Sequence, residues 1–270
     1  MLEQTVGFLG AGKMAEALSR GILAEGLVAA DRIVMSDADP DRRTLLADEL
    51  GVRTVADNAA MVEAADVVVL ALKPADLRAA LPPLAEAFAP GRLVVSIAAG
   101  VTLAELGTLL PDGARIVRVM PNTPALVGSG AAGFALGPGT TPQDRELVAS
   151  LLGAVGVAFP LPERLLDAVT GLSGSGPAFV ALVIEALADG GVLCGLPRHT
   201  ALALAAHTVL GAARLVVERD LHPALLKDMV ASPGGTTIAG LQVLEEQGLR
   251  AALIDAVDAA TRTSQELGRQ

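Results

Sequence analysis

One stretch near the N-terminus decides the fold: Val6-Gly7-Phe8-Leu9-Gly10-Ala11-Gly12-Lys13-Met14-Ala15. The apolar residues before Gly10 predict a short buried strand, and those from Lys13 onward predict a helix. Between them stands the pattern Gly-x-Gly-x-x-Ala. In this pattern Gly10 permits a tight turn, Gly12 lets the backbone approach a pyrophosphate, and Ala15 lets the helix pack closely on the strand. Because helix N-termini carry free N–H groups and a favourable dipole, the stretch predicts a dinucleotide-binding turn.

The first 160 residues alternate short Val/Ile/Leu runs with longer helical stretches, which predicts a mostly parallel sheet. The expected strands are Thr5–Leu9, Ile33–Ser36, Val67–Ala71, Leu93–Ile97, Ile116–Met120 and Val157–Pro160. The expected helices are Lys13–Glu25, Pro40–Leu50, Ala75–Ala87 and Thr102–Leu110. Thr102 with Glu105, and Thr141 with Asp144, have the spacing of helix caps. We therefore predict an α/β fold with a Rossmann-type, doubly wound sheet at the N-terminus.

The pattern changes near Pro160-Leu161-Pro162, and beyond it the chain predicts helices joined by Gly-rich loops. We expect a dinucleotide-binding domain over residues 1–160 and an all-helical substrate-binding and dimerisation domain over residues 161–270. The stretch Pro177–Leu193 is apolar almost all round, and such a helix must be buried on every side. A helical region this short has little interior, so the sequence predicts an obligate homodimer.

Charge and composition exclude several classes of protein. The formal net charge of −10 argues against a nucleic-acid partner, because no excess of Lys and Arg is available to neutralise phosphates. A single cysteine, Cys194, allows no disulfide within the chain and fits a reducing compartment. The longest uncharged run, Val119–Gln143, is interrupted by prolines and glycines, so it does not predict a membrane helix. We expect a soluble, cytoplasmic protein without a membrane partner.

The side chains available for catalysis are few. The chain has no Trp and no Tyr, and its three His residues show no metal-ligand spacing, so we expect no metal site and no Ser-His-Asp triad. His199 and His207 stand about two helical turns apart on an Ala/Leu-rich helix, where packing explains them. If the protein is an enzyme, a cofactor supplies the difficult chemistry.

The end of the second predicted strand bears on which cofactor binds. Asp37 stands where an acidic residue usually accepts the ribose 2′-hydroxyl of NADH, and its carboxylate repels the 2′-phosphate of NADPH. Ser36, Arg42 and Arg43 are close in sequence and have the chemistry to hold that phosphate. The sequence therefore leaves NADH and NADPH both open.

Two segments of the C-terminal half are rich in small residues. Gly171–Phe179 and Ser232–Ile238 each precede an expected helix and offer hydroxyl groups and backbone N–H groups at its N-terminus. Such a segment either caps and packs the helix or binds an anion, for example a substrate carboxylate. Because two occur within a short region, we favour anion binding, to which the first segment would bring the hydroxyl groups of Ser173 and Ser175.

Taken together, these segments resemble the pyrroline-5-carboxylate reductase family. The residues that carry the resemblance are Gly7–Met14, Ala71–Pro74, Val95–Val101, Met120–Pro124, Val169–Ala178 and Leu226–Thr237. The resemblance extends over essentially the whole chain, in order and at family spacing, and the last segment is the most specific. It implies an N-terminal Rossmann domain, a helical domain that dimerises by intertwining, and assembly as a dimer or as a decamer of five dimers.

The resemblance also implies a reaction and a set of residues. A hydride passes from NADPH or NADH to the C=N carbon of 1-pyrroline-5-carboxylate, giving L-proline. The residues implied at the cofactor are Gly10, Ala11, Gly12, Lys13, Met14, Ser36 or Asp37, Asn58, Leu72, Lys73 and Ala98. The substrate carboxylate is implied to lie on Ser232, Gly235, Thr236 and Thr237. Of these, Thr237 is the best candidate to hydrogen-bond the ring nitrogen. Asp220 falls where the family commonly has an acidic residue near the site.

The sequence departs from the family pattern at two positions, and three alternative functions stay open. Phe179 stands where many relatives have Tyr, so no phenol donates a proton here, and Asp37 replaces the usual small hydroxyl residue. Lys73 is either a contact of the cofactor or active site, or a solvated lysine that ends a strand. The alternative functions are a β-hydroxyacid dehydrogenase-type reductase, a reductase of another cyclic imine, and a dinucleotide-sensing protein without catalysis. The first would need Lys227 as its active-site lysine.

Overall fold

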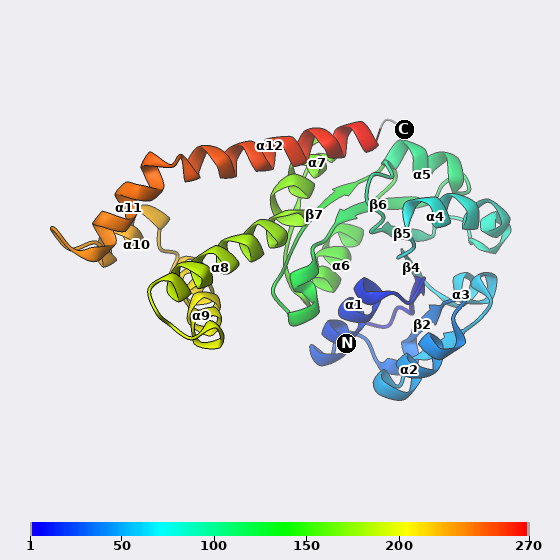
Figure 1. Ribbon diagram of the computed structural model, residues 1–270. Helices are drawn as coiled ribbons and strands as arrows, with labels where there is room; N and C mark the ends of the chain where they lie inside the picture. The colour runs from blue at the N-terminus through cyan, green and yellow to red at the C-terminus, as the bar shows by residue number, and fades with distance from the viewer. Residues whose placement is uncertain (1, 269–270) are drawn as a thin grey trace. The chain divides into compact units, whose positions relative to one another are not determined.

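The computed structural model describes residues 2–268, and the chain divides into two compact units. Residues 1–175 together with 259–270 form the first unit, and residues 176–258 form the second. The first unit is built on one eight-stranded sheet in the order β3-β2-β1-β4-β5-β6-β7-β8 (Figure 1). The strands are β1 Val6–Leu9, β2 Ile33–Ser36, β3 Arg53–Val55, β4 Val67–Leu70, β5 Leu93–Ser96, β6 Arg115–Met120, β7 Gly130–Leu136 and β8 Gly156–Pro160.

The pairing of the strands is that of a Rossmann-type sheet. All pairs from β3 to β6 are parallel, β6 and β7 are antiparallel, and β7 and β8 are parallel. The strand order reverses at β1, which pairs with β2 on one side and β4 on the other. In such sheets ligands bind at the carboxyl ends of the strands where the order reverses. The expected fold class is therefore confirmed.

Helices cover both faces of the sheet because alternate strand residues point to opposite sides. On one face Phe8 and Met35 pack in an apolar core with residues of α1 and α6, and on the other Leu9 and Val34 pack with residues of α3, α4 and α5. The helices of this part of the chain are α1 Lys13–Ala24, α2 Pro40–Leu50, α3 Asn58–Ala64, α4 Pro74–Ala80, α5 Leu103–Leu109 and α6 Pro142–Gly153.

The helix starts that the sequence indicates are present. The side chain of Thr102 accepts a hydrogen bond from the N–H of Glu105, and Thr141 and Asp144 form a reciprocal capping box. Pro40 and Pro142 occupy first-turn positions, where their missing N–H group costs no hydrogen bond.

Four details of the expected element pattern are wrong. The strand β7, the short strand β3 and the helix α3 were not expected, because β7 is made largely of Ala and Gly and the other two are short. The single helix expected over Ala75–Ala87 is instead α4 followed by a 3₁₀ segment, Pro82–Ala87. The prolines at its start lack N–H groups and end the α-helix.

The chain beyond residue 161 is helical, as expected. Its helices are α7 Leu166–Val169, a π-helical turn Thr170–Gly174, α8 Gly176–Leu193, α9 Arg198–Glu218, α10 Pro223–Val230, α11 Thr236–Glu246 and α12 Leu249–Leu267. The end of α12 belongs to the first unit, where the Ser264 hydroxyl donates to Asp167 Oδ1 at 2.7 Å.

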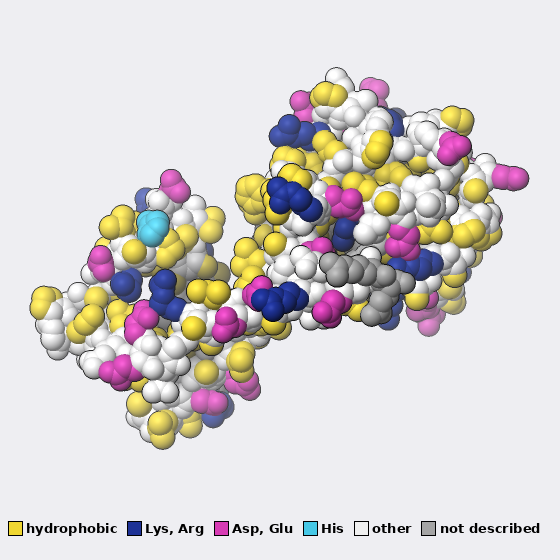
Figure 2. All heavy atoms as spheres, turned by 90° about the horizontal axis from the view of Figure 1, so that it is seen from above, with side chains coloured by type: hydrophobic (Ala, Val, Ile, Leu, Met, Phe, Trp, Pro, Cys, Tyr) yellow, Lys and Arg dark blue, Asp and Glu magenta, His cyan; other side chains and the backbone are white. Residues whose placement is uncertain are grey.

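The second unit leaves many large apolar side chains exposed within one chain, and Figure 2 shows apolar side chains over its surface. Among the described residues of α8, Ala188 is the only buried one. Leu182, Leu193 and Val217 are 65%, 88% and 77% exposed. Side chains of this kind are normally covered in the working assembly.

Candidate active site

The residues expected at the cofactor follow the carboxyl ends of five neighbouring strands. The glycine-rich turn Gly10–Met14 follows β1, Ser36 is the last residue of β2, and Asp37 follows it. The remaining four residues are Asn58 after β3, Leu72 and Lys73 after β4, and Ala98 after β5. These strands are adjacent and parallel, so the fold brings all these residues to the same edge of the sheet. Their role at a cofactor stays a prediction.

The turn after β1 requires glycine at its first position. Gly10 has φ +95°, which L side chains rarely adopt, and a Cβ there would lie 2.7 Å from Leu72 Cδ2. The turn after β1 thus passes close to Ala71 and Leu72, which follow β4.

Gly12 meets a different requirement. It has ordinary backbone angles, φ −67° and ψ −176°, and a Cβ placed on it would have no neighbour within 4 Å. Gly12 is also the N-cap of α1 and provides no side-chain cap, and the first helical hydrogen bond joins Glu16 N to Gly12 O at 3.0 Å. The N–H groups of the first turn therefore stand ready for an anion, as a dinucleotide diphosphate requires.

An ion-pair network holds this turn against α2. Glu16 Oε2 lies 2.6 Å from Arg42 Nη2, and Glu16 Oε1 lies 2.9 Å from Arg20 Nη2. Arg42 Nε also donates to the carbonyl of Ala11 at 2.6 Å. The hydrogen bond from Arg42 is the main reason that the pKa of Glu16 falls to about 2. The sequence did not indicate the pairing of Glu16 with Arg42, because the two residues are 26 positions apart along the chain.

The network predicts how stability depends on pH. A carboxylate with a lowered pKa in the folded state stabilises the fold above its unfolded pKa, and this contribution disappears as the pH falls toward the folded pKa. The contribution of Glu16 is therefore complete above about pH 4.5 and lost between that pH and about pH 2. We expect Glu16→Gln to lower the melting temperature at neutral pH, and the difference from the native protein to shrink below about pH 4.5.

Glu49→Gln is the matched control, because Glu49 pairs with the same Arg20 but is 44% exposed. Its effect on the melting temperature should be small at every pH. A Glu16→Gln difference that stays constant down to about pH 3 would contradict the assigned role of this network.

A cavity of about 560 Å³ lies beside the carboxyl ends of β4 and β5. It is lined within the first unit by Pro74, Arg78, Ala99, Gly100, Thr170, Ser175, Ala260, Thr263, Ser264 and Leu267. Pro74 and Ala99 are direct chain neighbours of Lys73 and Ala98, so the cavity continues from the expected cofactor edge. Lys73 itself is exposed and is the N-cap of α4.

The first Gly/Ser-rich segment is not the loop that the sequence indicated. Residues 170–174 form a π-helical turn that leads into α8, so their backbone groups bond within the helix, as Ser175 N does to Thr170 O at 2.8 Å. The hydroxyl of Ser173 donates to the carbonyl of Val169 at 3.0 Å. The expectation of free N–H groups in this segment is therefore wrong. Ser175 lines the 560 Å³ cavity, and the substrate role of Ser173 and Ser175 stays a prediction.

A buried amide fixes the π-helical turn, and the sequence did not single it out. Asn122 follows β6 and is 8% exposed. Its Nδ2 donates to the carbonyl of Ser173 at 3.1 Å, and its Oδ1 accepts from Ala131 N at 2.9 Å. The position between Pro121 and Thr123, directly after a strand, was the available signal. Asn122 thus positions the serine-bearing turn against the end of β6.

The second segment forms an open helix N-terminus in the second unit. The helix α11 begins at Thr236, its N-cap is Gly235, and no side chain caps it. Gly234 and Gly235 line a cavity of about 440 Å³ with Lys227 and Asp228. Asp220 follows α9, is exposed, and has a positive φ of 50°. The arrangement at α11 fits a carboxylate, which accepts hydrogen bonds from free N–H groups.

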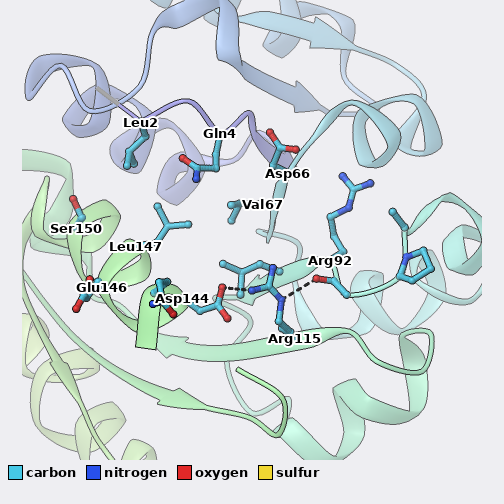
Figure 3. A pocket seen from close by; sticks show the side chains of 15 residues that line it. Leu2, Gln4, Asp66, Val67, Arg92, Arg115, Asp144, Glu146, Leu147 and Ser150 are labelled. Carbon is cyan, nitrogen blue, oxygen red and sulfur yellow. Dashed lines mark hydrogen bonds and ion pairs between the residues drawn. The ribbon is translucent and has the colours of Figure 1, made fainter. Parts of the chain in front are cut away.

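Another cavity lies beside the amino ends of the strands. It has a volume of about 670 Å³, and Arg92, Arg115, Asp66 and Asp144 are among its lining residues (Figure 3). Arg115 binds Asp144 at 2.6 Å and the carbonyl of Gly91 at 2.8 Å. Because ligands of this fold bind at the opposite edge, this cavity is separate from the candidate active site.

Comparisons with known proteins show which family the chain resembles. Residues 163–267 match the family described as pyrroline-5-carboxylate reductase dimerisation, and residues 5–100 match the family described as NADP oxidoreductase, coenzyme F420-dependent. A pyrroline-5-carboxylate reductase of Methanosarcina acetivorans is 49% identical over 100% of both chains. The structure of a pyrroline-5-carboxylate reductase from Coxiella burnetii has a TM-score of 0.94 at 36% identity and covers 98% of this chain and 99% of its own.

A second similar structure was solved with a cofactor bound. The pyrroline carboxylate reductase of Plasmodium falciparum, with NADP bound, has a TM-score of 0.87 at 29% identity and covers 99% of both chains. Relatives are similar to this chain over their full length, and its C-terminal region matches the dimerisation family. The open glycine-rich turn lies where the strand order reverses, as a dinucleotide site requires. The chain belongs to the pyrroline-5-carboxylate reductase family.

Proposed function

We propose that this protein reduces 1-pyrroline-5-carboxylate to L-proline with NADPH or NADH, the final step of proline biosynthesis. The observation that carries the proposal is the uncapped N-terminus of α1, which directly follows Gly12 at the reversal of strand order, in a chain of this family. We assign cofactor binding to residues 1–160, and substrate binding and dimerisation to residues 161–270.

Toward the nicotinamide cofactor, the residues of this chain need only to bind and orient it. The reduced nicotinamide supplies the hydride. The first-turn N–H groups of α1 hold the diphosphate, and Asp37 faces the adenosine ribose. Asn58, Leu72 and Ala98, which follow the ends of their strands, would lie along the cofactor. Lys73, exposed at the end of β4, contacts the cofactor or substrate.

The substrate side needs an anion site and a group at the ring nitrogen. The N-terminus of α11 holds the carboxylate through Ser232, Gly235, Thr236 and the backbone of Thr237. A protonated imine already accepts hydride at its C=N carbon, and the electron pair of the C=N bond then passes to nitrogen, giving the secondary amine. The Thr237 hydroxyl orients this nitrogen or carries its proton, and Asp220 provides the acidic group near the site. No phenol takes part, because the chain has no Tyr.

The protein works as a homo-oligomer, and we assign the helical region as the interface of a dimer, with a decamer of five dimers as a further assembly. The stretches Glu163–Leu193 and Arg198–Glu218 are long and apolar enough to cross a membrane by length and composition alone, and only 6% and 11% of their most apolar windows are buried within one chain. Both lie entirely within the region that matches the dimerisation family, so a second copy, rather than lipid, covers them.

This assignment predicts the behaviour in solution. We expect a dimer or a multiple of it at low micromolar concentration in sedimentation velocity. A stable, folded monomer at that concentration would contradict it. The formal charge of −10 supports a protein that binds no nucleic acid. The single cysteine, Cys194, supports a place in the reducing cytoplasm.

The proposed function is tested by following the oxidation of NADH and of NADPH, side by side, with 1-pyrroline-5-carboxylate as acceptor. Fast oxidation with at least one cofactor, with L-proline as product, is the expected result. A folded oligomer that binds cofactor but oxidises neither would contradict it.

A further inference from the structure

The edge of the sheet where β2 ends holds the groups that meet the adenosine ribose in this fold. The carboxylate of Asp37 accepts two backbone hydrogen bonds there, from Ala11 N at 2.9 Å and from Asp39 N at 3.0 Å. Ala11 is the middle residue of the glycine-rich turn. A negative charge is therefore fixed beside the cofactor turn.

The cations nearest in sequence are already engaged. Arg42 is 15% exposed, pairs with Glu16 at 2.6 Å and donates to the carbonyl of Ala11 at 2.6 Å. Arg43 Nη1 donates to the carbonyls of Asp37 at 2.7 Å and Ala38 at 3.1 Å. A 2′-phosphate would have to compete with Glu16 for Arg42.

The third candidate for a phosphate contact does not reach the surface. Ser36 is fully buried, and its hydroxyl has no hydrogen-bond partner among the described residues. A side chain enclosed in this way offers nothing to a ligand in the crevice. Of the groups that the sequence suggested for a 2′-phosphate, Ser36 is enclosed, Arg42 is paired with Glu16, and Arg43 is held through Nη1 by two backbone carbonyls.

We infer that Asp37 makes this protein select NADH over NADPH, which rests on the proposed function. The carboxylate accepts the ribose 2′-hydroxyl of NADH as a hydrogen-bond donor. The 2′-phosphate of NADPH has no such hydrogen, and it brings like charge to a carboxylate that two backbone N–H groups hold beside the turn. We expect NADH to bind at least about tenfold more tightly, since like-charge contacts at a binding site cost that much or more.

The test is direct binding without the imine, so that it does not depend on turnover. Because the chain has no Trp, the fluorescence of the reduced nicotinamide reports binding without interference from the protein. The dissociation constants for NADH and NADPH are measured at one fixed ionic strength, since charge effects are screened by salt. The variants are Asp37→Asn, which keeps the shape of the side chain, and Glu16→Gln, which releases Arg42. The control is Asp41→Asn, which removes the same charge from an exposed site on the first turn of α2.

The expected result is a native preference for NADH that moves toward NADPH by about tenfold or more in Asp37→Asn. Glu16→Gln should move it in the same direction, and Asp41→Asn should leave the ratio within about twofold. Native protein that binds NADPH as tightly as NADH would overturn the inference, as would an unchanged ratio in Asp37→Asn. If Asp37→Asn does not fold, the ratio of the two dissociation constants in the native protein and in Glu16→Gln tests the inference. Absence of turnover with either cofactor would instead contradict the proposed function and leave the binding result standing.

Discussion

Replacing Gly12 by alanine is expected to weaken the binding of NADH and NADPH by about ten- to a hundredfold while the fold keeps its stability. The structure separates the two effects. The backbone angles of Gly12 suit any residue, and a Cβ there meets nothing within 4 Å, so the free energy of unfolding should change by less than about 1 kcal/mol. A methyl group at the start of α1 nevertheless occupies the place where a diphosphate approaches the first-turn N–H groups.

Gly10→Ala is the contrasting variant. Its φ of +95° and the 2.7 Å approach to Leu72 Cδ2 predict a loss of stability of about 1–3 kcal/mol, in addition to weaker binding. Dissociation constants from cofactor fluorescence and unfolding curves in urea distinguish the two variants. Normal cofactor affinity in Gly12→Ala would show that the cofactor does not lie on this turn.

Replacing Thr237 by alanine is expected to lower kcat for 1-pyrroline-5-carboxylate reduction by tens-fold or more, since general acid–base groups contribute about 10²–10⁴-fold. The hydroxyl stands in the first turn of α11, beside the uncapped N–H groups assigned to the carboxylate. Without it the ring nitrogen loses its hydrogen-bonding partner, while the cofactor turn in the other unit is untouched. Cofactor affinity should therefore remain at the native value.

Thr237→Ser is the matched control, because it keeps the hydroxyl and removes only a methyl group. It should retain most of the native kcat. Comparing the change in kcat with the change in KM separates a role at the nitrogen from a role at the carboxylate. Loss of a carboxylate contact alone raises KM and leaves kcat unchanged. Unchanged kcat in Thr237→Ala would remove this hydroxyl from the mechanism.

Much of the first unit was predictable from local patterns. The Val/Ile/Leu runs gave the central strands within a residue or two, because strands buried on both faces are continuously apolar. The caps at Thr102 and Thr141 were predictable because their hydrogen bonds join residues three apart. By contrast, β7 consists mainly of Ala and Gly, and its place between β6 and β8 stabilises it rather than its own propensity.

The candidate site likewise has features that local sequence patterns predict and features that depend on distant contacts. The glycine-rich turn and Asp37 were predictable because a strand, a turn and a helix in series determine where they lie. The π-helical turn was not, since it depends on Asn122 bonding to a carbonyl far along the chain. Sequence reasoning also left Arg42 open as a phosphate ligand. Its pairing with Glu16 joins residues on two different helices, and only the packing of those helices brings them together.

The most direct measurement follows the hydride itself. Reduced cofactor carrying deuterium at the transferable position of the nicotinamide is oxidised with 1-pyrroline-5-carboxylate, and the proline is examined by NMR and mass spectrometry. We expect one deuterium on the former C=N carbon of each proline molecule, from label on one face of the nicotinamide only. Proline without the label, or cofactor oxidised with no proline formed, would contradict direct hydride transfer to the imine by this protein.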